Sequence, residues 1–375
     1  MALDLDIWTV EKLSEYFGGR PDVANLSLRE AIDLYTREKL AETIEYAREN
    51  SRFYGEELAD IGKPDAQNVQ SFLGEIPFTT AEDLREGEKD FLCVSPADIS
   101  RVVTLQTSGT TGKPKRIYFT EEDQLLTVDF FNHGMRLIVD ETDKVLILMP
   151  AAVPGSIGCL LGQGIRNIGA ETIEYGEPFK AGSEQGPPAE EAARILDLIR
   201  AEKVTSIVST PTHAVALARA YEKQMAGAED LEEIYLRSML LSAEFVPDQT
   251  VMMLEDAFQC MIFEHYGMTE MGLGCAVSCG YGRGYHIRET DIYIELINPL
   301  TGEVVPEESG RNTPGFSNYG EIVFTTLTRK GMPFIRYRTG DFSRWILDPC
   351  PCGSSMKRLD KVVPGDGRIE AQSKK

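Results

Sequence analysis

The sequence has no run of about eighteen apolar residues, the shortest stretch that commonly spans a lipid bilayer. It begins Met1-Ala2-Leu3-Asp4, whereas a secretory signal peptide opens with a basic region. Basic residues are few as well: 38 Lys and Arg stand against 60 Asp and Glu, and the net charge is −22 at pH 7. A surface of that charge repels nucleic acids and anionic membranes at long range. We therefore expect a cytoplasmic protein with no nucleic-acid partner and no membrane partner.

The cysteine content does not suggest a disulfide framework. Seven cysteines are scattered through 375 residues, and this odd number in a long chain favours free thiols or metal ligands over paired bridges. Hydrophobic residues make up 42% of the chain and charged residues 26%, as in a globular protein with a sizeable core. This composition excludes disordered, collagen-like and coiled-coil chains.

The pattern of apolar residues divides the chain into four regions. Residues 1–100 are predicted to be mostly helical. Residues 101–285 alternate short apolar runs with turns and amphipathic helices, which predicts parallel α/β layers. Residues 286–357 are predicted to form a β-rich lobe, and residues 358–375 a hinge-like stub and a polar tail.

Local signals support these regions. Ser27 and Glu30 have the spacing of a capping box in front of an amphipathic segment that reaches Arg48. The apolar runs of the α/β region lie at 102–105, 145–149, 205–208 and 238–241. The strands expected in the β-rich lobe lie at 291–297, 321–327 and 334–345 and are separated by Gly and Pro turns.

A loop rich in glycine and hydroxyl groups follows the first of these apolar runs. Its glycines let backbone N–H groups turn towards an anion, its hydroxyls add donors, and two lysines add positive charge. These residues are Thr107, Ser108, Gly109, Thr110, Thr111, Gly112, Lys113 and Lys115. The spacing excludes a P-loop, because Pro114 stands where that motif needs Ser or Thr. A plain solvent loop is the alternative, but the density of donors favours a nucleoside triphosphate.

This string resembles the phosphate loop of the adenylate-forming, or AMP-binding, superfamily. Further matching strings, in the order of that superfamily, lie at residues 76–85, 209–212, 242–244, 266–270 and 323–341. Together they resemble the phenylacetate–coenzyme A ligase branch. The resemblance implies an α/β fold: the large N-terminal domain of the superfamily, with parallel α/β sheet layers and a β-rich lobe.

The resemblance also implies roles for individual residues. It implies that Glu270 is a ligand for the Mg²⁺ that accompanies ATP and that Asp341 holds the ribose diol. Contact with phosphate is expected from Thr269, Lys113 and Arg338, and contact with adenine from Ser242, Ala243, Glu244, Tyr266 and Gly267. Simpler roles remain open: Glu270 as a solvated charge, Asp341 as a turn residue, Tyr266 as a core residue and Arg338 as the partner of a local acid.

The implied reaction joins a small carboxylic acid to AMP. The carboxylate attacks the α-phosphate of ATP, pyrophosphate leaves, and the acyl group passes to coenzyme A or to another thiol or amine. The branch suggests an aryl or arylacetic acid, held near the loops after Met149 and Val208. His213 lies where the branch has an aromatic residue, so it predicts either a more polar pocket or a structural histidine.

Four further residues form a candidate zinc set. Cys279, His286, Cys350 and Cys352 supply three thiolates and one imidazole, the donors of a closed structural zinc site, and similar residues recur in the branch. Cys275 is a rival for the place of His286. The alternative is four unrelated reduced residues.

The superfamily continues into a small C-terminal lid domain, and the sequence up to Lys375 has no match to one. We therefore expect either a lid supplied by a separate protein or slow turnover without a lid. Two other functions remain open: an acyl transferase like the short acyl-protein synthetases, and a non-catalytic module that binds nucleotide or acyl-adenylate.

Overall fold

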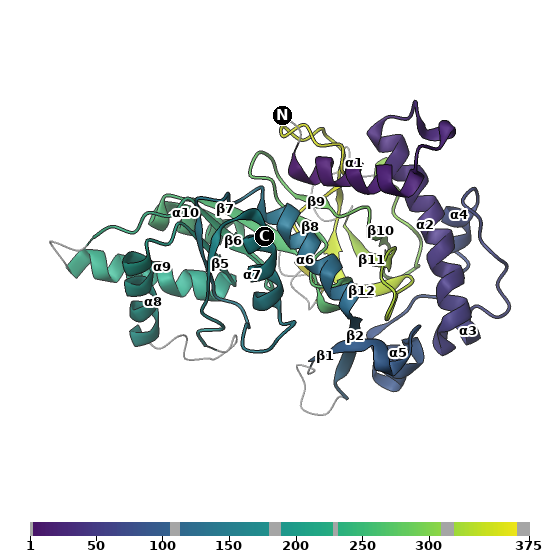
Figure 1. Cartoon of the computed structure of the whole chain (residues 1–375), viewed down its shortest axis with the longest axis horizontal. Coiled ribbons are helices and arrows are strands. Elements are labelled where there is room, and N and C mark those ends of the chain that lie inside the picture. The colour runs from purple at the N-terminus through teal and green to yellow at the C-terminus, as the bar shows by residue number, and fades with distance from the viewer. Residues whose placement is uncertain (1–2, 106–112, 180–188, 228–231, 309–318, 366–375) are drawn as a thin grey trace. The chain divides into compact units, whose positions relative to one another are not determined.

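A computed structural model describes residues 3–105, 113–179, 189–227, 232–308 and 319–365 (Figure 1). The chain forms two compact units. The first comprises residues 1–126, 269–275 and 286–375, and the second comprises residues 127–268 and 276–285. Among the described residues, no helix is both long enough and apolar enough to cross a membrane.

The helices of the first unit confirm the predicted helical start of the chain. They are α1 (Asp4–Phe17), α2 (Leu28–Asn50), α3 (Arg52–Glu57), α4 (Val69–Leu73) and α5 (Ala81–Gly87), with 3-10 turns at Pro21–Val23, Glu88–Phe91 and Pro96–Asp98. The predicted capping box of Ser27 and Glu30 is formed, and Thr80 with Asp83 forms a second one at α5. Each box satisfies backbone N–H groups that a helix start leaves free.

In the first unit, every pair of strands that share two or more paired residues is antiparallel. β1 (Ile99–Leu105) and β2 (Lys115–Thr120) form a hairpin, and β10 (Ile292–Ile297), β11 (Gly320–Thr326), β12 (Tyr337–Ser343) and β15 (Val363–Pro364) form a sheet in that order. β13 (Trp345–Ile346) pairs with β14 (Arg358–Leu359), and β9 (Tyr285–Ile287) lies at the division between the units.

Three sequence expectations for this unit differ from the structure. The run at 102–105 belongs to the antiparallel hairpin and is not part of the parallel layer. The strand expected at 334–345 begins only at Tyr337, because Arg336 has a φ of +51°, which lies outside the β region. Residues 358–365 carry β14 and β15, where a hinge-like stub was expected.

The second unit contains the predicted parallel sheet. Its strands are β3 (Lys144–Ile147), β4 (Glu171–Glu174), β5 (Ser206–Ser209), β6 (Ser238–Leu241) and β7 (Met261–Tyr266), in the order β7-β6-β5-β3-β4, with β8 (Ala276–Val277) antiparallel to β7. Its helices are α7 (Ile157–Ile168), α8 (Ala189–Glu202), α9 (Pro211–Gly227) and α10 (Asp248–Phe258). α6 (Glu121–Met135) begins in the first unit and ends in the second.

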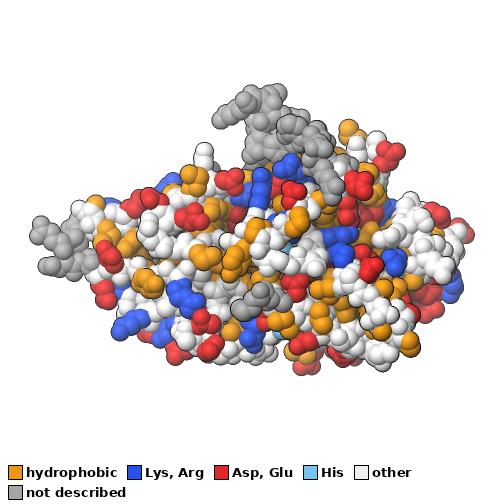
Figure 2. Space-filling model, turned by 90° about the horizontal axis from the view of Figure 1, so that it is seen from above, with side chains coloured by type: hydrophobic (Ala, Val, Ile, Leu, Met, Phe, Trp, Pro, Cys, Tyr) orange, Lys and Arg blue, Asp and Glu red, His pale blue; other side chains and the backbone are white. Residues whose placement is uncertain are grey.

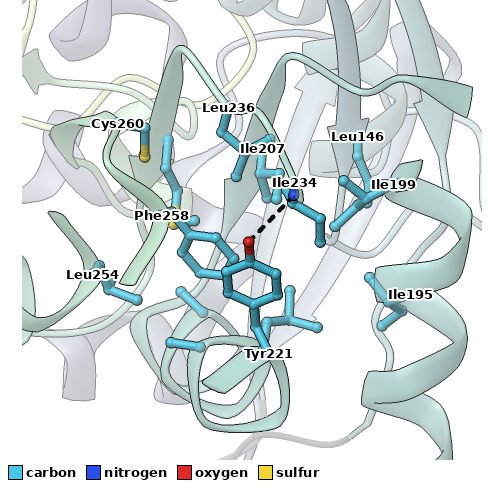
Figure 3. Close-up of a cluster of buried hydrophobic side chains, with 14 of the residues drawn as sticks. Leu146, Ile195, Ile199, Ile207, Tyr221, Ile234, Leu236, Leu254, Phe258 and Cys260 are labelled. Atoms are coloured by element: carbon cyan, nitrogen blue, oxygen red, sulfur yellow. Dashed lines mark hydrogen bonds between the residues drawn. The ribbon is translucent and has the colours of Figure 1, made fainter. Parts of the chain in front are cut away.

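One face of this sheet packs against α8, α9 and α10 (Figure 3). Ile207 points to this side, and the ring of Tyr221 stacks on Phe258 with centroids 5.4 Å apart. The Tyr221 hydroxyl accepts a hydrogen bond from the backbone N–H of Ile234 at 3.3 Å, so the one polar atom of this ring is satisfied. Successive side chains of a strand point to opposite faces of the sheet. Val208 follows Ile207 in β5 and therefore points to the opposite face, as does Leu240 in β6.

The charged surface agrees with the composition. In the face shown in Figure 2, Lys and Arg side chains are scattered among Asp and Glu, without a continuous basic field.

Candidate active site

The phosphate loop lies largely outside the described residues. Thr107, Ser108, Gly109, Thr110, Thr111 and Gly112 are all in this gap. Lys113 follows it and is exposed, and Lys115 is the first residue of β2. The hairpin of β1 and β2 therefore holds both ends of the loop.

Glu270 lies in a compact polar cluster of the first unit. Its side chain is almost fully buried, and its Oε1 atom lies 2.6 Å from the Nζ atom of Lys115. The hydroxyl of Tyr337 donates to the same oxygen at 3.2 Å and lies 3.4 Å from Lys115 Nζ. Burial, reinforced by Glu270, raises the pKa of Tyr337, so this hydroxyl remains a donor. The Glu270 carboxylate is thus fixed by one cation and one phenol.

Arg329 fixes the backbone of the same turn. Glu270 belongs to a 3-10 turn at Thr269–Met271, and Arg329 donates to the Glu270 carbonyl and to the Tyr118 carbonyl, both at 2.8 Å. Arg329 is buried, and burial lowers the pKa of its guanidinium. Thr269 is half-buried beside Glu270.

Arg338 pairs with a local acid. Its Nε atom lies 3.0 Å from the Glu321 carboxylate, and this hydrogen bond raises the pKa of Arg338. Of the two roles left open by the sequence, this geometry favours the local pair, and a contact with phosphate stays a prediction.

Asp341 follows a glycine on β12. Gly340 has a φ of +75°, and its N–H donates to Glu321 at 3.2 Å. The Asp341 N–H donates to the Thr339 hydroxyl at 3.0 Å, which orients the backbone on which the carboxylate is carried. A ribose contact by Asp341 stays a prediction.

The residues expected around adenine lie in the second unit. Ser242 follows β6, and Ala243 has a φ of +71°, a rare conformation for a residue with a side chain. Glu244 accepts hydrogen bonds from the backbone and the hydroxyl of Thr212, at the start of α9. Tyr266 ends β7 and is half-buried, as is Gly267 after it. The residues expected to contact adenine therefore all belong to one unit.

Sequence reasoning missed several residues of these sites. Lys115 was counted only among the loop donors, and Tyr337, Arg329 and His265 carried no assigned role. His265 directly precedes the recognised string at 266–270, and its position there was the one available signal. The structure joins it to Ser242: His265 Nδ1 lies 2.8 Å from the Ser242 hydroxyl.

His213 takes a structural position in the second unit. Its Nε2 atom lies 2.9 Å from the Phe179 carbonyl, and its ring meets the Phe179 ring edge to face at 4.2 Å. A carbonyl accepts only, so Nε2 carries the proton. These contacts favour the structural alternative for His213.

Three members of the candidate zinc set meet in the first unit. The possible ligand atoms of His286, Cys350 and Cys352 lie within 4.8 Å of one another, and His286 Nε2 is 3.4 Å from Cys352 Sγ. Gly353, with a φ of +84°, turns the chain after the two cysteines and donates to the Cys350 carbonyl. Cys275 is not in this group, and burial raises its pKa to about 12, which opposes a thiolate there.

Comparison with known proteins identifies the family. The model of the family "AMP-binding enzyme" matches residues 56–326. A phenylacetate-coenzyme A ligase of Pseudomonas putida is 29% identical over 340 residues, which are 89% of this chain and 70% of that protein. A phenylacetate-coenzyme A ligase of Thermus thermophilus is 27% identical over 350 residues, which are 92% of this chain and 72% of that protein.

A solved structure shares the fold. An open conformation of 2-hydroxyisobutyryl-CoA ligase, in complex with 2-HIB-AMP and CoA, aligns with a TM-score of 0.71 at 21% identity and covers 90% of this chain and 69% of that chain. This likeness confirms the expected α/β fold of the large domain. On the family match and the two relatives, the chain belongs to the AMP-binding enzyme family and is similar to its phenylacetate-coenzyme A ligase branch.

Proposed function

We propose that this chain uses ATP to convert an aryl or arylacetic acid into an acyl-adenylate and passes the acyl group to coenzyme A. The observation that carries the proposal is the Glu270 cluster, in which a buried carboxylate lies 2.6 Å from the lysine that follows the phosphate loop. The relatives named as phenylacetate-coenzyme A ligases supply the acid class, and the neighbour bound to 2-HIB-AMP and CoA supplies the acyl-adenylate intermediate and the acyl acceptor. We place the reaction in the cytoplasm.

In the proposed reaction, the residues of the chain position the groups and supply charge. Glu270 would hold the Mg²⁺ that neutralises the phosphates of ATP. Lys115 begins β2, three residues after Gly112 in the sequence, and contacts Glu270, so its ammonium would turn from Glu270 to the phosphates. Tyr337 and Arg329 would keep Glu270 oriented during this exchange. No protein nucleophile is needed, because the substrate carboxylate attacks the α-phosphate directly.

Acid-dependent exchange of label between pyrophosphate and ATP tests the proposal. We expect exchange with a phenylacetic or benzoic acid and formation of the acyl-coenzyme A thioester when coenzyme A is added. Calorimetry with MgATP should show binding that Asp341→Ala weakens. Absence of both exchange and nucleotide binding would contradict the proposal.

The same assays separate the other functions that the sequence left open. Nucleotide binding without exchange would indicate a binding module. An acyl label retained on a cysteine would indicate an enzyme like the acyl-protein synthetases. Exchange that appears only when a separate lid-domain protein is added would indicate a shared active site.

We also propose a structural zinc ion held by Cys279, His286, Cys350 and Cys352. The fit rests on the donor set, because two sulfurs and one imidazole nitrogen gather within 4.8 Å in the first unit. Burial, with a smaller contribution from Arg358, lowers the pKa of His286 to about 4, and a neutral imidazole is the form that binds a metal. Cys279 lies seven residues before His286 and is proposed as the fourth ligand on its type and position in the sequence.

Elemental analysis of untagged protein tests the zinc proposal. We expect about one zinc per chain, as for a closed four-ligand site. Cys352→Ser should lose the metal and lower the melting temperature, whereas Cys159→Ser, which changes a thiol outside the group, should retain the metal. Metal-free protein of unchanged stability would exclude the site.

A further inference from the structure

A cavity lies inside the second unit, on the face of the sheet opposite to α8, α9 and α10. Its walls come from α6, from α7 and from the carboxyl ends of β3, β5, β6 and β7. They include Phe131, Met149, Leu161, Val208, Leu240 and Val277. None of the lining residues is Lys, Arg, Asp or Glu, and the polar side chains among them are Ser242 and His265. The lining is therefore apolar and gives no counter-charge to a carboxylate; its free volume is about 20 Å³, so an aryl ring would have to displace lining side chains to enter.

The imidazole of His265 is held on one side only. Nδ1 lies 2.8 Å from the Ser242 hydroxyl, while Nε2 is buried and has no hydrogen-bond partner among the described residues. Phe130 and Phe131 flank the ring, with centroids 6.0 and 6.1 Å away. Burial lowers the pKa of His265 to about 4, so the ring is neutral near pH 7.

A buried polar atom without a partner is costly, and such an atom in a native protein usually has a role. A water molecule would be a poor partner here, since buried water needs two to four polar neighbours. Apart from Ser242, whose hydroxyl is already bonded to Nδ1, the remaining cavity walls are apolar. The missing partner is therefore best supplied by a ligand that brings its own polar group.

The position of the cavity identifies the ligand. Ligands of open α/β sheets bind at the carboxyl ends of the strands. Ser242 is adjacent in sequence to Ala243, and His265 to Tyr266, which are two of the residues expected to contact adenine. The group joined to AMP is the acid, so the cavity lies where the body of that acid would extend.

We propose that the acid activated by this chain is an aryl acid bearing a hydroxyl group, and that His265, oriented by Ser242, selects this hydroxyl through Nε2. The inference rests on the proposed function and specifies its substrate. A hydroxyl suits this position because it both donates and accepts, and so it satisfies Nε2 in either neutral tautomer. His265 is thus a specificity residue that contacts the substrate, and Ser242 is a positioning residue.

Pyrophosphate exchange with matched acids tests this selection. The panel is phenylacetic acid and its 2-, 3- and 4-hydroxy derivatives, each measured as kcat/KM. We expect one hydroxy isomer to exceed phenylacetic acid by about 10- to 100-fold, because the unsubstituted acid leaves Nε2 unpaired. His265→Leu should abolish or invert this ratio, and His265→Gln, which keeps a donor and an acceptor, should restore part of it.

His213→Leu is the matched control. His265 is half-buried with its Nε2 atom buried, whereas His213 is a buried histidine of the second unit that does not line the cavity. Its replacement should lower stability and leave the ratio between the acids unchanged. Equal kcat/KM for all four acids in the wild type, or the same loss of ratio in both leucine variants, would overturn the inference.

A spectroscopic measurement separates this inference from the proposed function. The chain has four histidines, so the imidazole ¹⁵N signals can be assigned by single replacements. The preferred hydroxy acid should shift the Nε2 signal of His265, and phenylacetic acid should not. If no acid supports exchange, the proposed function fails, and this shift alone decides the inference: its presence supports acid recognition and its absence overturns it.

Discussion

The two units differ in what they bury. The first unit buries charges: Asp291 lies 2.9 Å from Arg288 and 3.1 Å from Lys12, and Arg336 lies 3.1 Å from Glu295. The second unit buries hydrocarbon, and Asp143 is the one fully buried carboxylate among its described residues. Its central strands β3, β5 and β6 are short, mostly apolar and buried, as expected when both faces of a sheet are covered.

This difference matches the two parts of the proposed reaction. Charged networks tie distant segments at fixed angles, so they suit a unit that must orient Glu270 and Asp341. An apolar layer forms a cavity in which a single polar pair, Ser242 and His265, has a large effect on what binds. The predictions below test whether buried charges are important in the first unit and apolar packing in the second.

The largest effect is expected at Glu270. Glu270→Gln keeps the size of the side chain but removes the charge that Lys115 balances and that the proposed Mg²⁺ would need. We expect pyrophosphate exchange to fall roughly 10²- to 10³-fold, the usual loss when one fixed electrostatic contact to the transition state is removed. Glu82→Gln, at an exposed acid of the same unit, is the control, and equal rates in the two variants would contradict the role of Glu270.

The second test concerns stability in the first unit. Arg336→Met leaves Glu295 buried without its partner and removes the donor that Arg336 gives to the Leu73 and Ile76 carbonyls. We expect a loss of about 3–5 kcal/mol in the free energy of unfolding. Both tryptophans of the chain, Trp8 and Trp345, lie in this unit, so urea unfolding followed by tryptophan fluorescence reports on it.

A double variant shows whether the buried charge itself causes that loss. Arg336→Met combined with Glu295→Leu removes both charges, and we expect part of the stability to return. If the double variant loses the sum of the two single losses, the pair is not coupled and the comparison between the units fails for this site.

The third test concerns packing in the second unit. Leu254 is fully buried between α10 and the sheet, and Leu254→Ala should cost about 2–5 kcal/mol through lost contacts and a residual cavity. Hydrogen exchange of peptides from α9 and α10 measures this loss. Leu300→Ala, at a leucine that is 93% exposed, should change stability by less than about 0.5 kcal/mol. Similar exchange in both variants would contradict the packing role.

The last test is a pH dependence of stability from His265. Its pKa is about 4 in the folded chain and near 6.5 when unfolded, so between these values only the unfolded chain takes up the proton. The folded chain with neutral His265 therefore has its full stability above pH 6.5, and it loses free energy of unfolding as the pH falls towards 4. The stability difference between wild type and His265→Gln should therefore shrink over this range in urea unfolding followed by circular dichroism. Parallel pH curves would show that His265 does not titrate in this way.

The parts of the fold that are local in sequence were predictable. The capping box of Ser27 and Glu30 depends on residues three apart, and the strands at 238–241 and 205–208 depend on short apolar runs with breaks on both sides. The left-handed conformation of Arg336 was not predictable, because it is imposed by contacts with segments far along the chain, including the hydrogen bond from the Thr79 N–H to its carbonyl.

The candidate site was predictable only in part. The motif strings pointed to Glu270 and Asp341 as candidates, since each lies in a recognisable short pattern. Lys115 and Tyr337 meet Glu270 across 155 and 67 positions of sequence, and nothing local indicates that they do. The same reason explains why the sequence left open whether Arg338 contacts phosphate or a local acid, since Glu321 lies on the neighbouring strand.

The division of the chain into segments has a consequence for how the protein is made. The second unit is nearly continuous, whereas the first is assembled from residues 1–126, 269–275 and 286–375. During synthesis, the parallel sheet can close once β7 has emerged, but β12 must appear before Thr79 finds its partner. We therefore expect the amino-terminal helices to pack only after the last strands have been synthesised. Until then their apolar faces are exposed and can bind chaperones. We expect formation of the first unit to be the slow step of folding.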